Sequence, residues 1–214
     1  MNSNKLLRFV GIFYSLAANE ELPKNSDNLN TIKSNIENLE TFQARKKYAE
    51  KNLKHLSSGS SRIVYLTKDK TTFKLAKNNK GLAQNKAEAL LKDKSKYLNK
   101  ILSHAENYSW IETTYRKKIT EKQFKKQTKL DFDDFGECIR YGLRKNSRSK
   151  KEKPSCFENI SKSDIYKEIE EIGKKNNLMG GDLARISSWG TNGENPILID
   201  SGLTKEIFEK YYES

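Results

Sequence analysis

The sequence predicts an α+β protein, in which a small antiparallel sheet is preceded by helices and followed by a mainly helical part. In the first and last thirds, apolar residues recur three or four positions apart, the spacing of helices with one buried face. Between them, two short apolar and β-branched runs flank a tight turn, which predicts a β-hairpin. Near the end, a glycine-rich turn interrupts the helical pattern and an apolar strand follows.

The composition is that of a globular, basic protein. A chain of 214 residues is long enough for one sizeable domain, or for one domain with an appendage. Hydrophobic residues make up 35% and charged residues 32%, and the apolar clusters are dense enough to exclude a disordered chain. The net charge of +13 favours nucleotide phosphates, nucleic acid, an acidic protein or an anionic membrane, and charge alone does not choose between them.

Cysteine and histidine are too scarce for several kinds of site. Cys138 and Cys156 lack a CxxC spacing and are too few for a disulfide framework, so we expect a reducing, cytoplasmic setting. With only His55 and His104, a histidine-rich metal site is excluded and a histidine-dependent triad is not expected. Arg8 interrupts the apolar stretch near the start and leaves it too short to span a bilayer, so we expect no membrane association.

Residues 1–54 are predicted to form a helical extension. A packed amphipathic helix, rather than a signal peptide, is expected where four apolar residues recur at helical spacing: Leu6, Val10, Phe13 and Ala17. After the polar segment 19–30, a second helix is expected, with one apolar face formed by Ile32, Ile36, Leu39 and Phe42.

Residues 55–115 are predicted to form the sheet with one helix. A small-residue turn at 57–61 leads to a strand at 63–66, and the turn 68–70 leads to a strand at 71–76. A further strand before the first turn is possible on the same pattern. A helix over 84–102 and a short strand at 110–112 complete this region.

Residues 116–214 are predicted to be mainly helical. A basic, helix-prone stretch leads to a loop at 144–154, and a helix follows over 163–175, with Asp164 near its start. Its buried face comprises Ile165, Ile169 and Ile172. A Gly-Gly-Asp turn, a polar loop and the apolar strand 196–199 come next.

Residues 56–65 resemble the glycine-rich loop of protein kinases, whose pattern is G-x-G-x-x-G-x-V. Gly59 matches the second glycine and Val64 the valine, while Ser57 and Arg62 replace the outer glycines. The resemblance implies that Val64 packs on adenine. It also implies that nucleotide phosphates are covered by Ser58, Gly59 and Ser60. A plain serine-rich hairpin turn remains the alternative.

Lys74 resembles the nucleotide-binding lysine of the third kinase strand, in the position of the lysine of V-A-I-K. It lies ten residues after Val64 and has Phe73 and Leu75 beside it. The resemblance implies a glutamate partner from the following helix, for which Glu88 is the candidate. It also implies a nucleotide contact from Glu112, in a hinge-like segment. An ordinary surface lysine and helical glutamate remain the alternative.

Two segments near the end, 180–189 and 197–203, resemble the catalytic loop and the D-F-G motif of the kinase superfamily. The closer likeness is to small-molecule phosphotransferases, written H-G-D-x-x-x-x-N and I-D-x-G. The resemblance implies that Asp182 accepts the proton of the substrate hydroxyl and that Asp200 holds Mg²⁺. Ser187 stands in the place of the second metal-binding asparagine, and Arg185 is a candidate to neutralise the transferring phosphoryl group. A helix stop and a strand end remain the alternative.

Together these motifs predict a protein-kinase-like chain over residues 55–205, with a small sheet-containing N-lobe and a truncated helical C-lobe. The implied cofactors are ATP and Mg²⁺, and the implied reaction is phosphoryl transfer to a hydroxyl of a protein or of the chain itself. Twelve residues follow Gly202, too few for an activation segment and a peptide-binding platform. Substrate recognition is therefore expected elsewhere.

Two other functions remain open. A pseudokinase or nucleotide-binding regulator is favoured by Ser187, Arg62 and the truncated lobe. A basic nucleic-acid-binding protein without ATP chemistry is favoured by the net charge. The basic run 144–153 is either a docking site for an anionic partner or a solvated loop.

Overall fold

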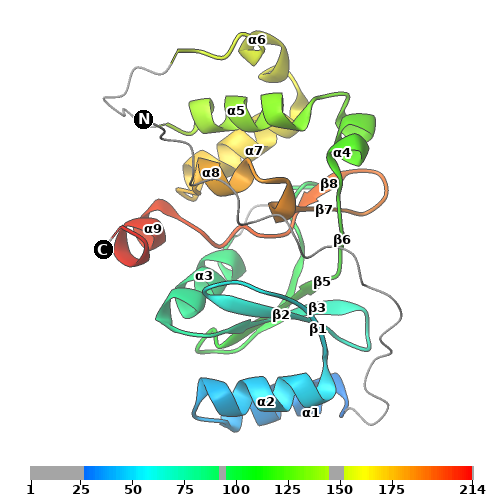
Figure 1. The fold of residues 1–214 in the computed structure, drawn as a ribbon, viewed down its shortest axis with the longest axis vertical. Coiled ribbons are helices and arrows are strands. Elements are labelled where there is room, and N and C mark those ends of the chain that lie inside the picture. Colours follow the sequence, from blue (N-terminus) through cyan, green and yellow to red (C-terminus); the bar gives the residue numbers. More distant parts are fainter. Residues whose placement is uncertain (1–26, 92–94, 145–151, 214) are drawn as a thin grey trace, which may run out of the picture.

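The computed structural model describes residues 27–91, 95–144 and 152–213. The helix expected within residues 1–18 and most of the basic run 144–153 lie outside them. The α+β prediction is confirmed, because a five-stranded antiparallel sheet is combined with helices (Figure 1). In the described residues, every helix is too short or too polar to cross a membrane.

The larger sheet has the strand order β1-β2-β3-β5-β4, with every neighbouring pair antiparallel. The hairpin predicted around the turn 68–70 is present, and so is the possible strand before it. Residues directly opposite each other share a face of the sheet, so Val64, Lys74 and Ile111 lie on one face. The strands are β1 (Lys54–Ser58), β2 (Arg62–Leu66), β3 (Thr71–Ala76), β4 (Ile101–His104) and β5 (Trp110–Thr114).

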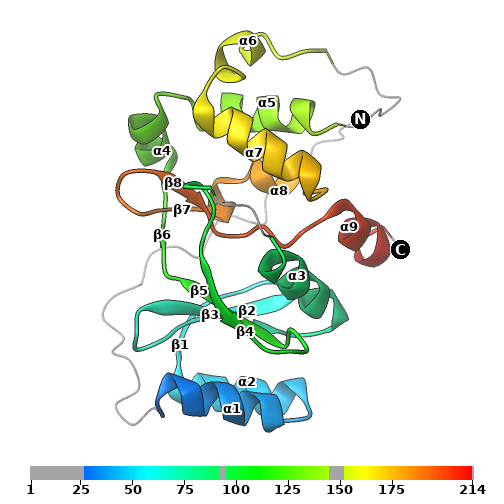
Figure 2. The same ribbon diagram turned by 180° about the vertical axis from the view of Figure 1, so that it is seen from behind.

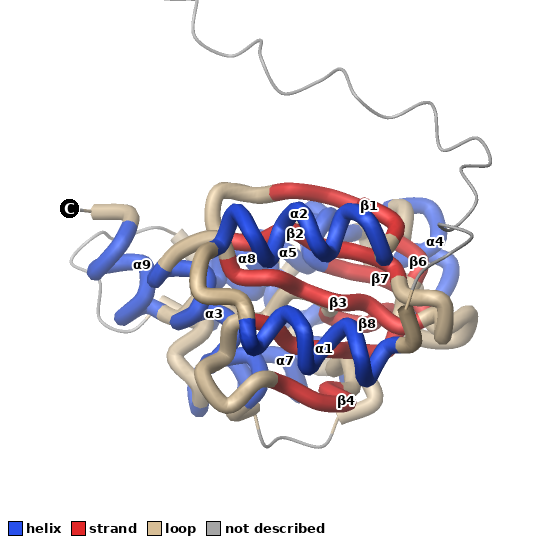
Figure 3. The backbone as a smooth tube through the Cα atoms, turned by 90° about the horizontal axis from the view of Figure 1, so that it is seen from below, coloured by secondary structure: helices blue, strands red, loops and turns tan. Residues whose placement is uncertain are grey.

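Two helices, α1 (Leu29–Asn38) and α2 (Phe42–Asn52), cover the other face of this sheet (Figure 3). A single helix through Phe42 was expected, and this was wrong. Leu39 is extended, and the Thr41 side chain caps α2 by accepting a hydrogen bond from the Ala44 N–H. Both helices contribute to one core with the sheet, which includes Ile32, Ile36, Ala49, Phe73, Leu75 and Trp110.

The helix on the Lys74 face, α3 (Asn79–Ala89), is shorter than predicted and begins earlier. Asn78 caps it by accepting a hydrogen bond from the Gly81 N–H. Of the described residues of the predicted helix beyond α3, only the last two, Ile101 and Leu102, belong to a regular element, β4, in which alternate residues are half-buried against the neighbouring strand. At Ile101 and Leu102, strand pairing therefore overrides the predicted helix.

The second part of the chain, from β6 onward, contributes most of a separate apolar core. In it, α7 packs alongside α5 (Figure 2). The predicted helix at 163–175 is confirmed, with Ser163 as its cap. Strands β6, β7 and β8 form a small sheet. The elements are β6 (Lys117–Lys118), α4 (Glu121–Thr128), α5 (Phe132–Gly142), α6 (Phe157–Ile160), α7 (Asp164–Lys175), α8 (Gly180–Leu183), a 3-10 turn (Ile186–Ser188), β7 (Trp189–Thr191), β8 (Pro196–Leu198) and α9 (Lys205–Tyr211).

The two parts are held together close to the end of β8. The Leu198 N–H donates to the Tyr97 carbonyl at 2.7 Å, and its carbonyl accepts from the Asn99 N–H at 3.2 Å. Gly202 packs against α3, since a Cβ atom there would lie 2.5 Å from the carbonyl oxygen of Gln84. Residues just after β8 are therefore fixed against the Lys74 face of the larger sheet.

Cys138 and Cys156 lie together, which their spacing did not predict. Their Sγ atoms are 3.4 Å apart, and both thiols are free. Burial, followed by the contact with Cys156, raises the pKa of Cys138 to about 12. Because the thiolate is the reactive form, this environment suppresses the reactivity of Cys138.

Candidate functional site

Lys74 and Glu88 form a buried ion pair in the interior of the protein. The Lys74 Nζ atom lies 2.5 Å from Glu88 Oε1 and 2.6 Å from the carbonyl oxygen of Ile199. Lys74 is 4% exposed and Glu88 is 2% exposed, so each charge depends on its partners. The structure thus brings together the lysine and glutamate that the motifs singled out, next to the residue that precedes Asp200.

Arg62 belongs to the same cluster, although the sequence identified it only as a departure from the glycine pattern. Its Nη1 atom donates to Glu88 Oε2 at 2.7 Å and to Asn85 Oδ1 at 3.3 Å, and its Nη2 atom donates to Asp200 Oδ1. The signal that points to it is strand alternation, because Arg62 lies two residues before Val64 and shares the face of Lys74.

Asp200 follows β8 and keeps contact with solvent, since its side chain is 51% exposed. Burial would raise the pKa of this carboxyl, but the charges of Arg62 and Lys74 outweigh that effect and hold its pKa below the ordinary value. Asp200 is therefore an anion at neutral pH.

Asp182 lies in α8 and forms an ion pair with Arg185, whose Nη1 atom is 3.0 Å from Asp182 Oδ1. Burial raises the pKa of Asp182, and the negative charge of Asp200 adds to this, while Arg185 and Arg62 oppose it. Ser187 is exposed, and among the described residues no hydrogen bond joins it to either aspartate. Asp182 is thus the carboxyl whose environment favours taking up a proton.

Asp182→Asn is expected to stabilise the fold at neutral pH and to lose that advantage in acid. The folded chain holds the Asp182 proton more tightly than the unfolded chain, so stability falls as pH rises from the ordinary pKa of 3.8 through the raised pKa. Asparagine does not ionise, so the variant avoids the loss of stability that comes from a charged carboxylate at this partly buried position. Urea unfolding at about pH 7 and about pH 3 should give a higher midpoint for the variant only at the higher pH. A variant that is less stable than wild type at neutral pH would contradict the assignment.

The serine-rich turn between β1 and β2 is tied to the start of α3. The Lys77 Nζ atom donates to Ser58 Oγ at 2.7 Å and to the Gly59 carbonyl at 2.6 Å. Asn78 Nδ2 donates to the Ser60 carbonyl at 3.2 Å. Gly81 approaches the end of the turn so closely that a Cβ atom would lie 2.2 Å from the Ser61 carbonyl oxygen. The turn is therefore held beside the helix that carries Glu88.

The position of Glu112 does not fit the nucleotide contact predicted for it. Glu112 lies directly opposite Phe73, on the sheet face covered by α1 and α2. It forms an ion pair with Lys33 at 2.7 Å and accepts from Ser103 Oγ at 2.8 Å. The segment 110–112 forms the first three residues of β5 rather than a hinge, and the chain leaves β5 for β6 at residues 115–116.

The donors near Asp200 fit a magnesium ion held mainly by phosphate and water. Mg²⁺ prefers oxygen ligands and is commonly held by one or two carboxylates together with substrate phosphates. Asp200 and Asp182 offer two carboxylates, and Ser187 offers an exposed hydroxyl. In the described part of the chain, no group of three or more His, Cys, Asp or Glu side chains is arranged to hold a metal. The chain alone therefore does not form a complete metal cage.

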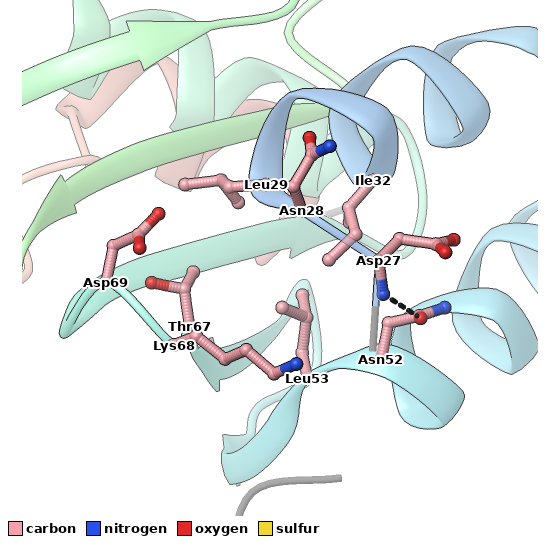
Figure 4. A pocket seen from close by; sticks show the side chains of 9 residues that line it. All are labelled: Asp27, Asn28, Leu29, Ile32, Asn52, Leu53, Thr67, Lys68 and Asp69. Atoms are coloured by element: carbon pink, nitrogen blue, oxygen red, sulfur yellow. Dashed lines mark hydrogen bonds between the residues drawn. The ribbon is translucent and has the colours of Figure 1, made fainter. Parts of the chain in front are cut away.

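A separate pocket lies away from this cluster, at the outer helices (Figure 4). It is formed by the start of α1, the end of α2 and the turn between β2 and β3, and the Asp27 N–H donates to Asn52 Oδ1 there at 3.1 Å. It contains none of the residues that the motifs predicted, and we assign it no role.

No protein-family model matches the sequence, and no curated protein gives a significant match. Among solved structures, the streptomycin–ATP–APH(2'')-IIa ternary complex is similar over 49% of this chain and 38% of that chain, with a TM-score of 0.29 and 15% sequence identity. The ADP-bound aminoglycoside phosphotransferase APH(2'')-Ib is similar over 45% of this chain and 36% of that chain, with a TM-score of 0.28 and 16% identity. The likeness is distant and spans little more than a third of each of those chains.

Proposed function

We propose that this chain is a kinase-like phosphotransferase that uses ATP and Mg²⁺ to phosphorylate a hydroxyl of a protein or of itself. The observation that carries the proposal is the buried Lys74–Glu88 pair, with Lys74 also bonded to the backbone beside Asp200. Protein kinases need such a lysine–glutamate pair between the third strand and the following helix for activity. Here the pair joins β3 to α3.

In the proposed reaction, Lys74, Asp182 and Asp200 each have a separate task. Lys74, oriented by Glu88, binds the nucleotide phosphates, and Asp182 accepts the proton of the acceptor hydroxyl. The acceptor oxygen forms a bond to the γ-phosphorus while the bond from that phosphorus to the bridging oxygen breaks, and ADP leaves with the electron pair. Bound Mg²⁺ would neutralise charge on the phosphates, and Asp200 would hold it.

A second candidate function is a nucleotide-dependent regulator that does not transfer phosphate. The specific observation in its favour is Arg62, whose guanidinium already neutralises Asp200 and Glu88. In this case the chain would bind nucleotide and change its stability or its partners without turnover. The two candidates differ in whether label from ATP reaches an acceptor.

The test follows transfer of label from γ-³²P-ATP with Mg²⁺ or Mn²⁺, together with release of phosphate. Asp182→Asn is expected to reduce transfer by about 10²–10⁴-fold, the usual contribution of a positioned base. Asp200→Asn should abolish the metal-dependent rate. Asp69→Asn, which changes an exposed aspartate in the turn after β2, is the matched control and should act like wild type.

Transfer that persists in both site variants would contradict the proposal. A nucleotide-induced thermal shift without label or phosphate release would instead favour the regulator. If no divalent metal gave either a nucleotide-induced thermal shift or label transfer, an ATP site would be excluded.

A further inference from the structure

Arg62 places a permanent positive charge between two carboxylates of the candidate site. Its side chain is 7% exposed, and its guanidinium bonds to Glu88 on α3 and to Asp200 after β8. Burial disfavours this charge, but Asp200 and Glu88 outweigh the effect and hold the pKa of Arg62 above its ordinary value. The guanidinium is thus a cation at every physiological pH.

The charges in this cluster already balance. Lys74 and Arg62 supply two positive charges, and Glu88 and Asp200 supply two negative ones. Glu88 uses one oxygen for Lys74 and the other for Arg62, so its carboxylate is fully engaged. Of the two acids, Asp200 alone combines an Arg62 bond with substantial solvent exposure. It is therefore the group that can exchange its partner without unfolding the buried pair.

A divalent cation at Asp200 would meet the guanidinium at close range. Two like charges a few ångströms apart in a partly buried site repel strongly, and the bonded oxygen is not free to coordinate a metal. The bonds from Arg62 to Glu88 and Asn85 do not depend on Asp200 and keep the guanidinium beside the site.

We propose that Arg62 is a built-in competitor of Mg²⁺ for Asp200, so that the metal binds only when Arg62 releases this carboxylate. The inference rests on the proposed function, because it takes Asp200 as the metal ligand. A nucleotide phosphate is the ligand that would draw Arg62 away, since guanidinium groups pair with phosphate as readily as with carboxylate. Arg62 thus makes metal binding depend on nucleotide.

The test measures binding of Mn²⁺ alone to the full chain, without nucleotide, from the electron paramagnetic resonance signal of free Mn²⁺ at constant ionic strength. Wild type should bind weakly, and Arg62→Gln should bind at least about tenfold more tightly because one repelling charge is removed. Arg45→Gln makes the same charge change on α2, across the sheet, and should alter the affinity by less than about threefold. Adding Asp200→Asn to Arg62→Gln should abolish the gain.

If Arg62→Gln fails to fold, Arg62→Lys decides the question. A single ammonium on a shorter side chain cannot bond to Glu88 and Asp200 in the manner of the guanidinium fork, so Mn²⁺ affinity should still rise. Unchanged affinity in a folded Arg62 variant, or a gain that survives Asp200→Asn, overturns the proposal. If Arg62→Gln binds Mn²⁺ more tightly but neither wild type nor any variant transfers label, the phosphotransferase proposal is contradicted and this inference stands. If wild type transfers label but the Arg62 variants bind Mn²⁺ no more tightly, this inference is contradicted and the phosphotransferase proposal stands.

Discussion

Replacing Glu88 with alanine should lower the free energy of unfolding by about 3–5 kcal/mol, the usual cost of removing one partner from a buried ion pair. The loss should lie at the upper end of this range, because Glu88 is the shared partner of Lys74 and Arg62 and two buried cations would lose it together. Urea or thermal unfolding of the purified variant measures the change.

Two further variants sharpen this expectation. Lys74→Met should cost less than Glu88→Ala, since Glu88 would keep Arg62 as its partner. Glu171→Ala, at an exposed position of α7, should change stability by no more than about 0.5 kcal/mol. If Glu88→Ala and Glu171→Ala proved equally mild, the Lys74–Glu88–Arg62 cluster would not be a feature of the folded chain.

Trp189→Ala should cost about 3–5 kcal/mol, the range for removing a large buried aromatic side chain. Trp189 is fully buried, and its ring packs edge-on against Phe124 and Phe135 at centroid distances of 6.0 and 5.8 Å. Its Nε1 atom also donates to the Leu183 carbonyl at 2.8 Å. Because Leu183 follows Asp182 in α8, the loss should loosen the segment that holds the candidate base.

The measurement is denaturant unfolding, with hydrogen exchange of the 180–188 segment as a local readout. Trp189→Phe keeps much of the packing but leaves the Leu183 carbonyl without its donor, so a cost of about 1–3 kcal/mol is expected. Tyr115→Ala removes a partly exposed ring between the two parts of the chain and should be much milder. A Trp189→Ala variant with wild-type stability would show that the second core is not assembled around this ring.

Local pattern predicted the elements that depend on near neighbours. The hairpin from β2 to β3 follows from two apolar runs around a short turn, and α7 follows from isoleucines at helical spacing after Ser163. The prediction failed where pairing with another strand decided the outcome, as at Ile101 and Leu102, which were assigned to a helix and pair with β5 instead. The break between α1 and α2 was missed because the spacing of Leu39 and Phe42 continues the apolar face of α1, so it does not distinguish one continuous helix from two.

The sequence by itself determined which residue types are available for phosphate chemistry and their order: Lys74, Glu88, Asp182 and Asp200. Alternation along β2 places Arg62 on the same face as Val64, but its sharing of that face with Lys74 was decided by the register of β2 against β3. Only the tertiary structure decided which groups meet. The bond between Arg62 and Asp200 joins residues 138 positions apart, and Glu112 was turned toward Lys33 by its register in β5. Periodicity tells which face a side chain occupies, whereas its partner depends on how separate elements pack, which no local pattern encodes.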